Sequence, residues 1–278
     1  MTEKNESIRN APIGVFDSGV GGLTVAREII RQMPDEGIIY FGDTARVPYG
    51  SKSKDTIIRY SRQIIRFLKT RQVKAIVIAC NTASAYALEE VKKELDIPIL
   101  GVIRAGAVSA VKATQNGKIG IIGTEGTVRS GIYETVIKEM MPQARVTGKA
   151  CPLLVPLVEE GLLHDSVTDE IASRYLSELK AKYVDTLVLG CTHYPLLRST
   201  IKRLMGEAVT LINPAYETAI ELKSLLEKED LICCPGVCRT EERYQFYVSD
   251  LADKFTNFAS SILPQQVKET KKIDIENY

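Results

Sequence analysis

The sequence predicts an α/β protein of two similar lobes, each a mostly parallel sheet flanked by helices, with the active site in the cleft between them. Short apolar runs alternate with amphipathic segments along the chain, a pattern typical of parallel sheets covered by helices. Two pairs of segments also match at a nearly constant offset: residues 13–22 match 119–128, and residues 75–82 match 186–193. This repetition suggests that one half of the chain resembles the other.

Eight apolar runs are predicted as strands because each is short and is bounded by small or polar residues. They are residues 12–17, 37–42, 75–80, 97–102, 118–123, 144–150, 184–191 and 208–212. Between them, three segments carry a buried face at helical spacing. These faces are Ile57, Ser61, Ile64, Ile65 and Leu68; Ser84, Ala87, Leu88, Val91 and Leu95; and Val167, Ile171, Tyr175 and Leu179.

The length of 278 residues suggests one or two domains, at roughly 150 residues each. We expect residues 105–212 to form one lobe, and residues 1–104 together with 213–278 to form the other. The last residues, 268–278, combine mixed charge with little apolar content. They are therefore predicted to be a frayed terminus.

Composition excludes several classes of function. The net charge is +1 and no basic patch occurs, so no nucleic-acid partner is expected. No apolar run approaches the ~20 residues of a membrane span, and the polar N-terminus does not resemble a signal peptide. We therefore expect a cytoplasmic protein whose six cysteines are reduced thiols. Cys233, Cys234 and Cys238 suggest a metal, but without a second cysteine pair no zinc site is expected.

Polar side chains stand at or just beyond the carboxyl ends of five predicted strands. They are Asp17, Asp43, Cys80, Thr124 and Cys191. In open α/β sheets, ligands bind at that edge. The five positions together therefore indicate a binding site.

Cys80 begins the first of two matching motifs and is followed by Asn81 and Thr82. A thiol at the start of a helix meets unpaired backbone N–H groups and a partial positive charge. Both favour the thiolate, so we expect the pKa of Cys80 to be lowered. Asn81 and Thr82 supply donors for a carboxylate or an amine. The alternative is a buried structural cysteine.

Cys191 begins the second motif and is followed by Thr192 and His193. An imidazole beside a thiol can accept its proton or stabilise its thiolate. A cysteine–histidine pair also fits a thiol hydrolase, so this motif alone does not separate proton transfer from acyl transfer. Two thiols that share a cleft could place a base on one face of a substrate and an acid on the other, which would invert a stereocentre.

The loop after the first predicted strand, residues 17–22, is rich in glycine, which allows close approach of the backbone to a ligand. Asp17 is predicted to partner an amine or a thiol, and Ser18 to donate to a carboxylate. A phosphate-binding loop is the alternative, although its dinucleotide fingerprint would need glycine where Thr24 stands. Because Asp43 could hold a ribose, a nucleotide-binding regulatory module remains a second hypothesis.

Pro48 and Gly50 bracket Tyr49 in a loop rich in hydrogen-bonding groups, and they would fix its backbone. The alternative is an ordinary connection to a following helix.

Polar residues in two further segments fit either a binding role or a structural role. Thr124 and Thr127 stand at a predicted helix start, where they could donate to a ligand or simply cap the helix. Glu159 could orient His193, or it could belong to a solvated helix face.

Five segments resemble the signature segments of glutamate racemases, which are cofactor-independent enzymes of the aspartate/glutamate racemase superfamily. They are FDSGVGGLTV (16–25), FGDTARVPYGSKS (41–53), ACNTASA (79–85), CPLLVPLVEEG (151–161) and LGCTHYPLL (189–197). The resemblance implies interconversion of L- and D-glutamate with no cofactor and no metal. The D-form would supply peptidoglycan synthesis for the cell wall. It also implies a homodimer, and a racemase for aspartate or another amino acid is the nearest alternative.

The resemblance further implies roles for single residues. Cys80 would remove the α-proton of D-glutamate and Cys191 that of L-glutamate. Asp17 would assist Cys80, and His193 would assist Cys191 with Glu159 behind it. The substrate-binding positions would be Asp17, Ser18, Tyr49, Gly50, Asn81, Thr82, Thr124, Thr192 and His193. We add their neighbours Pro48 and Thr127 to the predicted substrate-binding residues.

Overall fold

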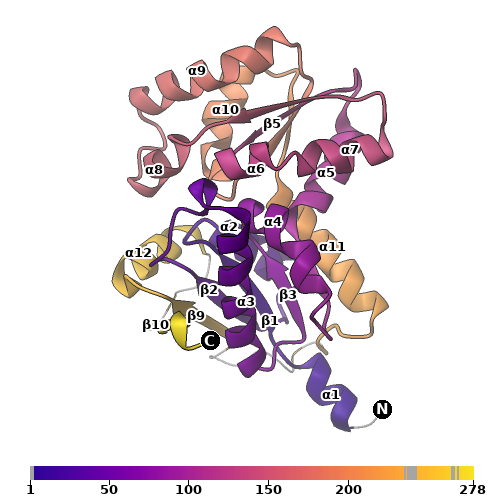
Figure 1. Ribbon diagram of the computed structural model, residues 1–278, viewed down its shortest axis with the longest axis vertical. Coiled ribbons are helices and arrows are strands. Elements are labelled where there is room, and N and C mark those ends of the chain that lie inside the picture. Colours follow the sequence, from indigo (N-terminus) through magenta and orange to yellow (C-terminus); the bar gives the residue numbers. More distant parts are fainter. Residues whose placement is uncertain (1–2, 235, 237–242, 264–266, 268) are drawn as a thin grey trace.

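The strands form two separate sheets in the computed structural model, which describes residues 3–234, 236, 243–263, 267 and 269–278. Figure 1 shows one sheet in the lower part of the molecule and the other in the upper part. Every strand pairing in both sheets is parallel. The predicted α/β class is thereby confirmed. The division into residues 105–212 and the rest stays a prediction.

The first sheet has six strands with β1 near its middle. In spatial order they are β10 (Thr270–Lys272), β9 (Tyr244–Val248), β2 (Ile38–Gly42), β1 (Ile13–Asp17), β3 (Ala75–Ile78) and β4 (Ile99–Gly101). Strands β9 and β10 were not predicted. The other four match predicted strands to within one or two residues at either end.

The second sheet has four strands, and all of them were predicted. In spatial order they are β6 (Arg145–Ala150), β5 (Lys118–Gly123), β7 (Thr186–Gly190) and β8 (Thr210–Ile212). Both β5 and β7 are almost wholly buried, as expected of strands covered on two faces.

Helices cover both faces of the first sheet, and the strand residues alternate between them. Ile13 and Val15 of β1 pack on one face, whereas Phe16 packs on the other. The first face is covered by α2 (Leu23–Gln32), α11 (Pro214–Lys228) and α12 (Ala252–Ile262). The opposite face is covered by α3 (Lys54–Thr70) and α4 (Asn81–Lys92).

The second sheet is also covered on both faces. One face packs on α8 (Leu154–Glu159), α9 (Ser166–Ala181), η2 (Tyr194–Leu197) and α10 (Arg198–Met205), and the other on α5 (Val102–Ala113) and α7 (Ile132–Met140). Three further short helices are α1 (Glu3–Arg9), η1 (Tyr49–Ser51) and α6 (Glu125–Arg129). Among the described residues, no helix is both long enough and apolar enough to cross a membrane.

The inward face of α9 differs from the prediction. Val167 is exposed, and the buried positions are Thr168, Ala172, Leu176 and Leu179. Leu179 is buried as predicted, and Ile171 and Tyr175 pack partly buried against the same core, so the prediction is wrong for Val167 and the buried face extends to Thr168, Ala172 and Leu176. Thr168 accounts for this in part, because its hydroxyl donates to the carbonyl of Leu162 at 2.6 Å and holds the first turn inward.

The C-terminus is ordered, so the prediction of a frayed end is wrong for residues 269–278; Lys268 lies outside the described residues. Strand β10 pairs with β9, and η3 (Ile275–Asn277) follows it. Ile275 is buried in the core under α3, and the ring of Tyr278 meets Phe67 edge-on. Two well-placed apolar side chains anchor a segment whose average composition is polar.

The cysteines are not all reduced. Cys80, Cys151, Cys191 and Cys234 are free thiols, but Cys233 is disulfide-bonded. The expectation of six reduced thiols is therefore wrong for Cys233. Cys238, which the sequence analysis grouped with it, lies outside the described residues.

Candidate active site

A cavity of about 410 Å³ lies between the carboxyl ends of strands from the two sheets. Cys80, which follows β3 of the first sheet, and Cys191, which follows β7 of the second, both line it. The predicted site residues on its wall are Ser18, Pro48, Tyr49, Gly50, Cys80, Asn81, Thr82, Thr124, Glu159, Cys191, Thr192 and His193. Two predicted residues, Asp17 and Thr127, lie outside that wall.

Cys80 caps the N-terminus of α4. Its sulfur accepts a hydrogen bond from the backbone N–H of Ala83 at 3.4 Å and donates to Oγ of Ser18 at 3.7 Å. Burial and the charge of Asp17 raise the pKa of Cys80 to about 12, and the helix N-terminus opposes them only weakly. The expected lowering of this pKa is therefore wrong, and Cys80 is a protonated thiol at neutral pH.

Asp17 is completely buried at the end of β1. Its Oδ2 accepts hydrogen bonds from the backbone N–H groups of Gly19 at 3.1 Å and Gly22 at 3.0 Å. Its Oδ1 has no hydrogen-bond partner among the described residues. Burial raises the pKa of Asp17. This carboxyl group therefore shapes the glycine loop directly, and it affects Cys80 through its charge.

Cys191, His193 and Glu159 form a line of contacts on the opposite wall. Nδ1 of His193 lies 3.7 Å from Sγ of Cys191, and Nε2 lies 3.0 Å from Oε1 of Glu159. Burial lowers the pKa of His193, but the hydrogen bonds to Cys191 and Glu159 outweigh it and raise this pKa to about 10. The hydrogen bond from His193 in turn lowers the pKa of Glu159. Glu159 is thus part of the site and not simply of a solvated helix face.

The two thiols therefore stand in unlike environments. A buried carboxyl group lies near Cys80, whereas an imidazole that is charged at neutral pH lies beside Cys191. A positive neighbour favours a thiolate and a negative neighbour favours a thiol. The cavity therefore carries one thiol near a buried carboxyl group and one sulfur beside an imidazolium.

Three threonine hydroxyls meet where the two sheets face each other. Oγ1 of Thr82, on α4, lies 2.8 Å from Oγ1 of Thr124 and 3.2 Å from that of Thr127. Thr124 also caps α6, since its hydroxyl accepts from the backbone N–H of Thr127 at 3.1 Å. The capping role considered for Thr124 is therefore confirmed, and donation to a ligand stays a prediction for a residue that lines the cavity. Thr127 is buried behind it and contacts the cavity residues without lining the wall.

Asn81 is held by a residue that sequence reasoning missed. The buried hydroxyl of Tyr133, on α7, donates to Oδ1 of Asn81 at 2.7 Å. This contact leaves the amide nitrogen of Asn81 as the group able to donate to a ligand. Tyr133 belongs to no recognisable motif, so no signal in the sequence pointed to it.

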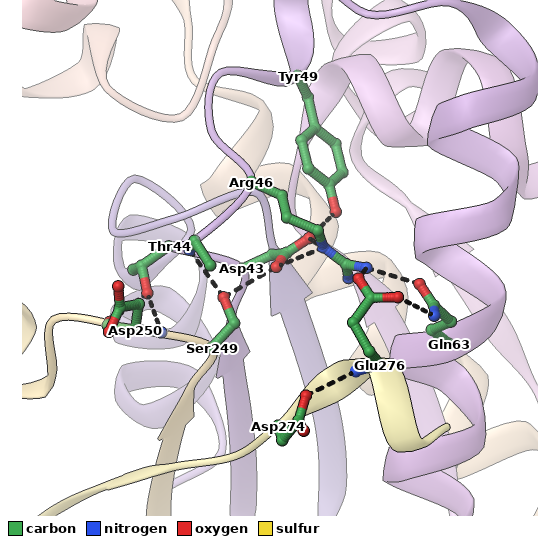
Figure 2. A network of polar contacts seen from close by, with 10 residues as sticks. Asp43, Thr44, Arg46, Tyr49, Gln63, Ser249, Asp250, Asp274 and Glu276 are labelled. Atoms are coloured by element: carbon green, nitrogen blue, oxygen red, sulfur yellow. Dashed lines mark hydrogen bonds and ion pairs between the residues drawn. The ribbon is translucent and has the colours of Figure 1, made fainter.

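Asp43 does not have the surroundings that a nucleotide site would need. It is fully buried, and its carboxylate accepts hydrogen bonds from Arg46, Ser249 and the hydroxyl of Tyr49 (Figure 2). These bonds occupy both oxygens, so none remains for a ribose. Tyr49 lines the cavity, but its hydroxyl is directed at Asp43 and not at a ligand.

The cavity also has lining residues that were not predicted. They are Gly19, Val47, Ser51, Glu125, Pro152, Val155 and Pro156. Each lies close in sequence to a predicted site residue or within the segment 151–161, and that adjacency was the available signal. Among the described residues, no group of three side chains is arranged to hold a metal ion.

Comparison with known proteins agrees with this geometry. The family model described as Asp/Glu/Hydantoin racemase matches residues 13–221, a span that contains both thiols and every predicted site residue. The chain belongs to the Asp/Glu/Hydantoin racemase family.

Named relatives of this racemase-family chain match along nearly its whole length. The glutamate racemase of Geobacter metallireducens is 47% identical and that of Streptococcus gordonii 49%, covering 95% and 93% of this chain and 97% of each relative. The crystal structure of a glutamate racemase from Bacillus anthracis has a TM-score of 0.87 at 42% identity, covering 95% of this chain and 97% of that one. The glutamate racemase of Francisella tularensis, solved in complex with D-glutamate, has a TM-score of 0.89 at 36% identity. The match covers 97% of this chain and 100% of that one.

Proposed function

We propose that this protein is a cofactor-independent glutamate racemase that moves one proton between two cysteines. The observation that carries the proposal is that Cys80 and Cys191, from corresponding strand ends of the two sheets, line one cavity. The named relatives and the D-glutamate complex of the Francisella tularensis enzyme support glutamate as the substrate.

In the direction from L- to D-glutamate, Cys191 acts as the base. Its thiolate, beside the protonated His193, takes the α-proton, and the Cα–H electron pair passes into the carboxylate-stabilised carbanion. Cys80 then donates its thiol proton to the opposite face of Cα, which produces D-glutamate. The reverse reaction starts with Cys80 as thiolate and Cys191 as thiol. Asp17, which favours the protonated form of Cys80, assists this sulfur when it holds the proton to be donated, and His193 assists Cys191 when that sulfur is the thiolate.

The carbanion needs hydrogen-bond donors aimed at the α-carboxylate. Ser18, Thr82, Thr124 and Thr192 offer hydroxyls to the cavity, and Asn81 offers its amide nitrogen. Preorganised donors of this kind stabilise developing negative charge, and loss of one costs on the order of 100-fold in rate. Pro48, Tyr49 and Gly50 complete the wall, and Thr127 supports Thr124 from behind.

The proposal extends to the setting of the reaction. D-Glutamate produced here would be consumed in peptidoglycan synthesis, and the enzyme would act in the cytoplasm as a homodimer. Sedimentation of the purified protein tests the dimer. A panel of L-amino acids that includes aspartate tests the substrate, since a racemase for aspartate is the nearest competing function.

The decisive experiment is chiral analysis of glutamate after incubation with purified protein and no added cofactor. Both enantiomers should converge on an equal mixture. Cys80→Ser and Cys191→Ser should each nearly abolish the reaction, while Cys234→Ser, at a free thiol that does not line the cavity, serves as the matched control. A serine variant of either cavity cysteine with near-normal turnover would remove that residue from the chemistry.

A further inference from the structure

The loop between β2 and α3 supplies Val47, Pro48, Tyr49, Gly50 and Ser51 to the cavity wall. It also reaches the other lobe, because a Cβ atom on Gly50 would lie only 2.8 Å from Cβ of Thr124. A small displacement of this loop would therefore change both the wall of the cavity and the contact across the cleft.

The inner end of this loop is held by a network centred on Arg46, shown in Figure 2. Nε of Arg46 donates to both carboxylate oxygens of Asp43, at 3.0 and 2.8 Å. The guanidinium also stacks on the ring of Tyr60, 3.9 Å from its centroid. Asp43 in turn accepts from the hydroxyl of Tyr49. Arg46 thus connects to the cavity wall through one carboxylate.

The other side of Arg46 is held by the C-terminus of the chain. Nη1 donates to Oε1 of Glu276 at 2.9 Å and to Oε1 of Gln63 at 2.6 Å. The amide nitrogen of Gln63 donates to the second oxygen of Glu276 at 3.1 Å. The hydrogen bond from Gln63 and the charge of Arg46 lower the pKa of Glu276, so its carboxylate is charged at neutral pH.

The segment that carries Glu276 is itself fixed to the lobe. The backbone N–H of Glu276 donates to Oδ1 of Asp274 at 3.2 Å, and the neighbouring Ile275 is buried under α3. A carboxylate on an anchored segment can orient a nearly buried guanidinium, because the guanidinium has few water molecules to replace a lost partner.

We propose that Glu276 is a positioning residue for the cavity loop, acting through Arg46 and Asp43 on Tyr49. The C-terminus thereby sets the geometry of a site that it does not touch. The kinetic test of this inference, which measures KM and kcat, rests on the proposed racemase function. The hydrogen-exchange test does not, because it measures the loop directly.

The kinetic test compares Glu276→Gln with Glu269→Gln. Glu269 undergoes the same chemical change on the same terminal segment, but within the described part of the chain its carboxylate pairs with the exposed Lys271 and not with Arg46 or Gln63. We expect Glu276→Gln to raise KM for both enantiomers roughly three- to tenfold, as for the loss of one charge-assisted hydrogen bond, with kcat changed by less than about twofold. Glu269→Gln should leave both constants unchanged.

A double-mutant cycle separates positioning from general weakening of the fold. Tyr49→Phe removes only the hydroxyl that bonds Asp43, so Glu276→Gln should add little to KM in that background. Additive effects would show that Glu276 does not act through Tyr49 and would overturn the proposal.

Hydrogen exchange tests the same connection without reference to activity. The backbone amides of residues 45–47 and 49–51 should exchange faster in Glu276→Gln than in Glu269→Gln, while the amides of β1 and β3 should be unchanged. Equal exchange in the two variants would overturn the inference even if the wild-type protein racemises glutamate. A wild-type protein without racemase activity would overturn the proposed function, and the exchange result would still decide the role of Glu276.

Discussion

Oε1 of Glu159 lies 3.0 Å from Nε2 of His193, so one carboxylate holds the imidazole from the side opposite the Cys191 sulfur. The side chain of His193 is almost fully buried, whereas that of Glu159 is about a third exposed. This relationship keeps a positive charge beside a cysteine inside a cavity where burial alone would remove it. The proposed role of Cys191 as a base depends on this charge.

Glu159→Gln should therefore shift the pH dependence of turnover. In the wild-type protein the pKa of His193, raised to about 10, keeps the imidazolium through neutral pH and loses it only as the pH rises through that value. Without the carboxylate this pKa falls, so the alkaline limb of activity from L-glutamate should move to lower pH by about one pH unit for each unit of pKa lost. Initial-rate pH profiles measure this. The exposed Glu160→Gln is the matched control, and an unchanged alkaline limb in Glu159→Gln would contradict the expectation.

The thiol of Cys80 should react slowly with alkylating reagents near neutral pH, because burial and Asp17 raise its pKa to about 12. Asp17→Asn keeps the shape of the side chain and removes its charge. Alkylation of Cys80 at pH 8 should then accelerate by roughly tenfold for each unit by which the pKa falls. Timed alkylation followed by peptide mass spectrometry gives the rate. Cys151, whose pKa is likewise raised to about 12 by burial, is the internal control, and parallel changes at both thiols would point to general loosening instead.

The first turnover in heavy water should show two bases and not one. The proposed mechanism places Cys80 and Cys191 on opposite faces of the substrate, so the proton that leaves one face differs from the one that arrives at the other. Product should carry deuterium at Cα from its first appearance, while the remaining substrate stays mostly protiated. Mass spectrometry of the separated enantiomers at early times measures both. Equal washout from the two enantiomers would indicate a single base.

Tyr133→Phe should weaken both the fold and substrate binding. It removes the donor to Oδ1 of Asn81 and leaves a buried acceptor unsatisfied, at a cost of about 1–3 kcal/mol in the free energy of unfolding. Freed from this contact, the amide of Asn81 can rotate, so KM for glutamate should rise more than kcat falls. Denaturant unfolding and steady-state kinetics check the two effects. Tyr183→Phe, at a position that is 75% exposed, should change neither.

Much of the site follows from local sequence pattern. Buried parallel strands are short apolar runs bounded by small or polar residues. The carboxyl ends of parallel strands within one sheet lie along the same edge. Cys80 and Cys191 could therefore be placed at strand ends from sequence, and twelve of the predicted site residues line one cavity. Strands β9 and β10 escaped prediction because neither precedes a recognisable motif, and β10 is the polar run Thr270–Lys272 with no apolar residue to mark it.

What sequence could not decide depends on contacts between distant residues. The sign of the pKa shift at Cys80 required its burial and its distance from Asp17, which a helix N-terminus does not reveal. Tyr133 and Asn81 are hydrogen-bonded although they are 52 residues apart in the sequence, and Glu276 and Arg46 although they are 230 residues apart. No local periodicity in the sequence predicts such contacts. The amino-acid sequence by itself determined which chemical groups stand at the strand ends. Only the packing of the two sheets decided their protonation and their supporting partners, because desolvation and Coulomb interactions depend on distance through space and not along the chain.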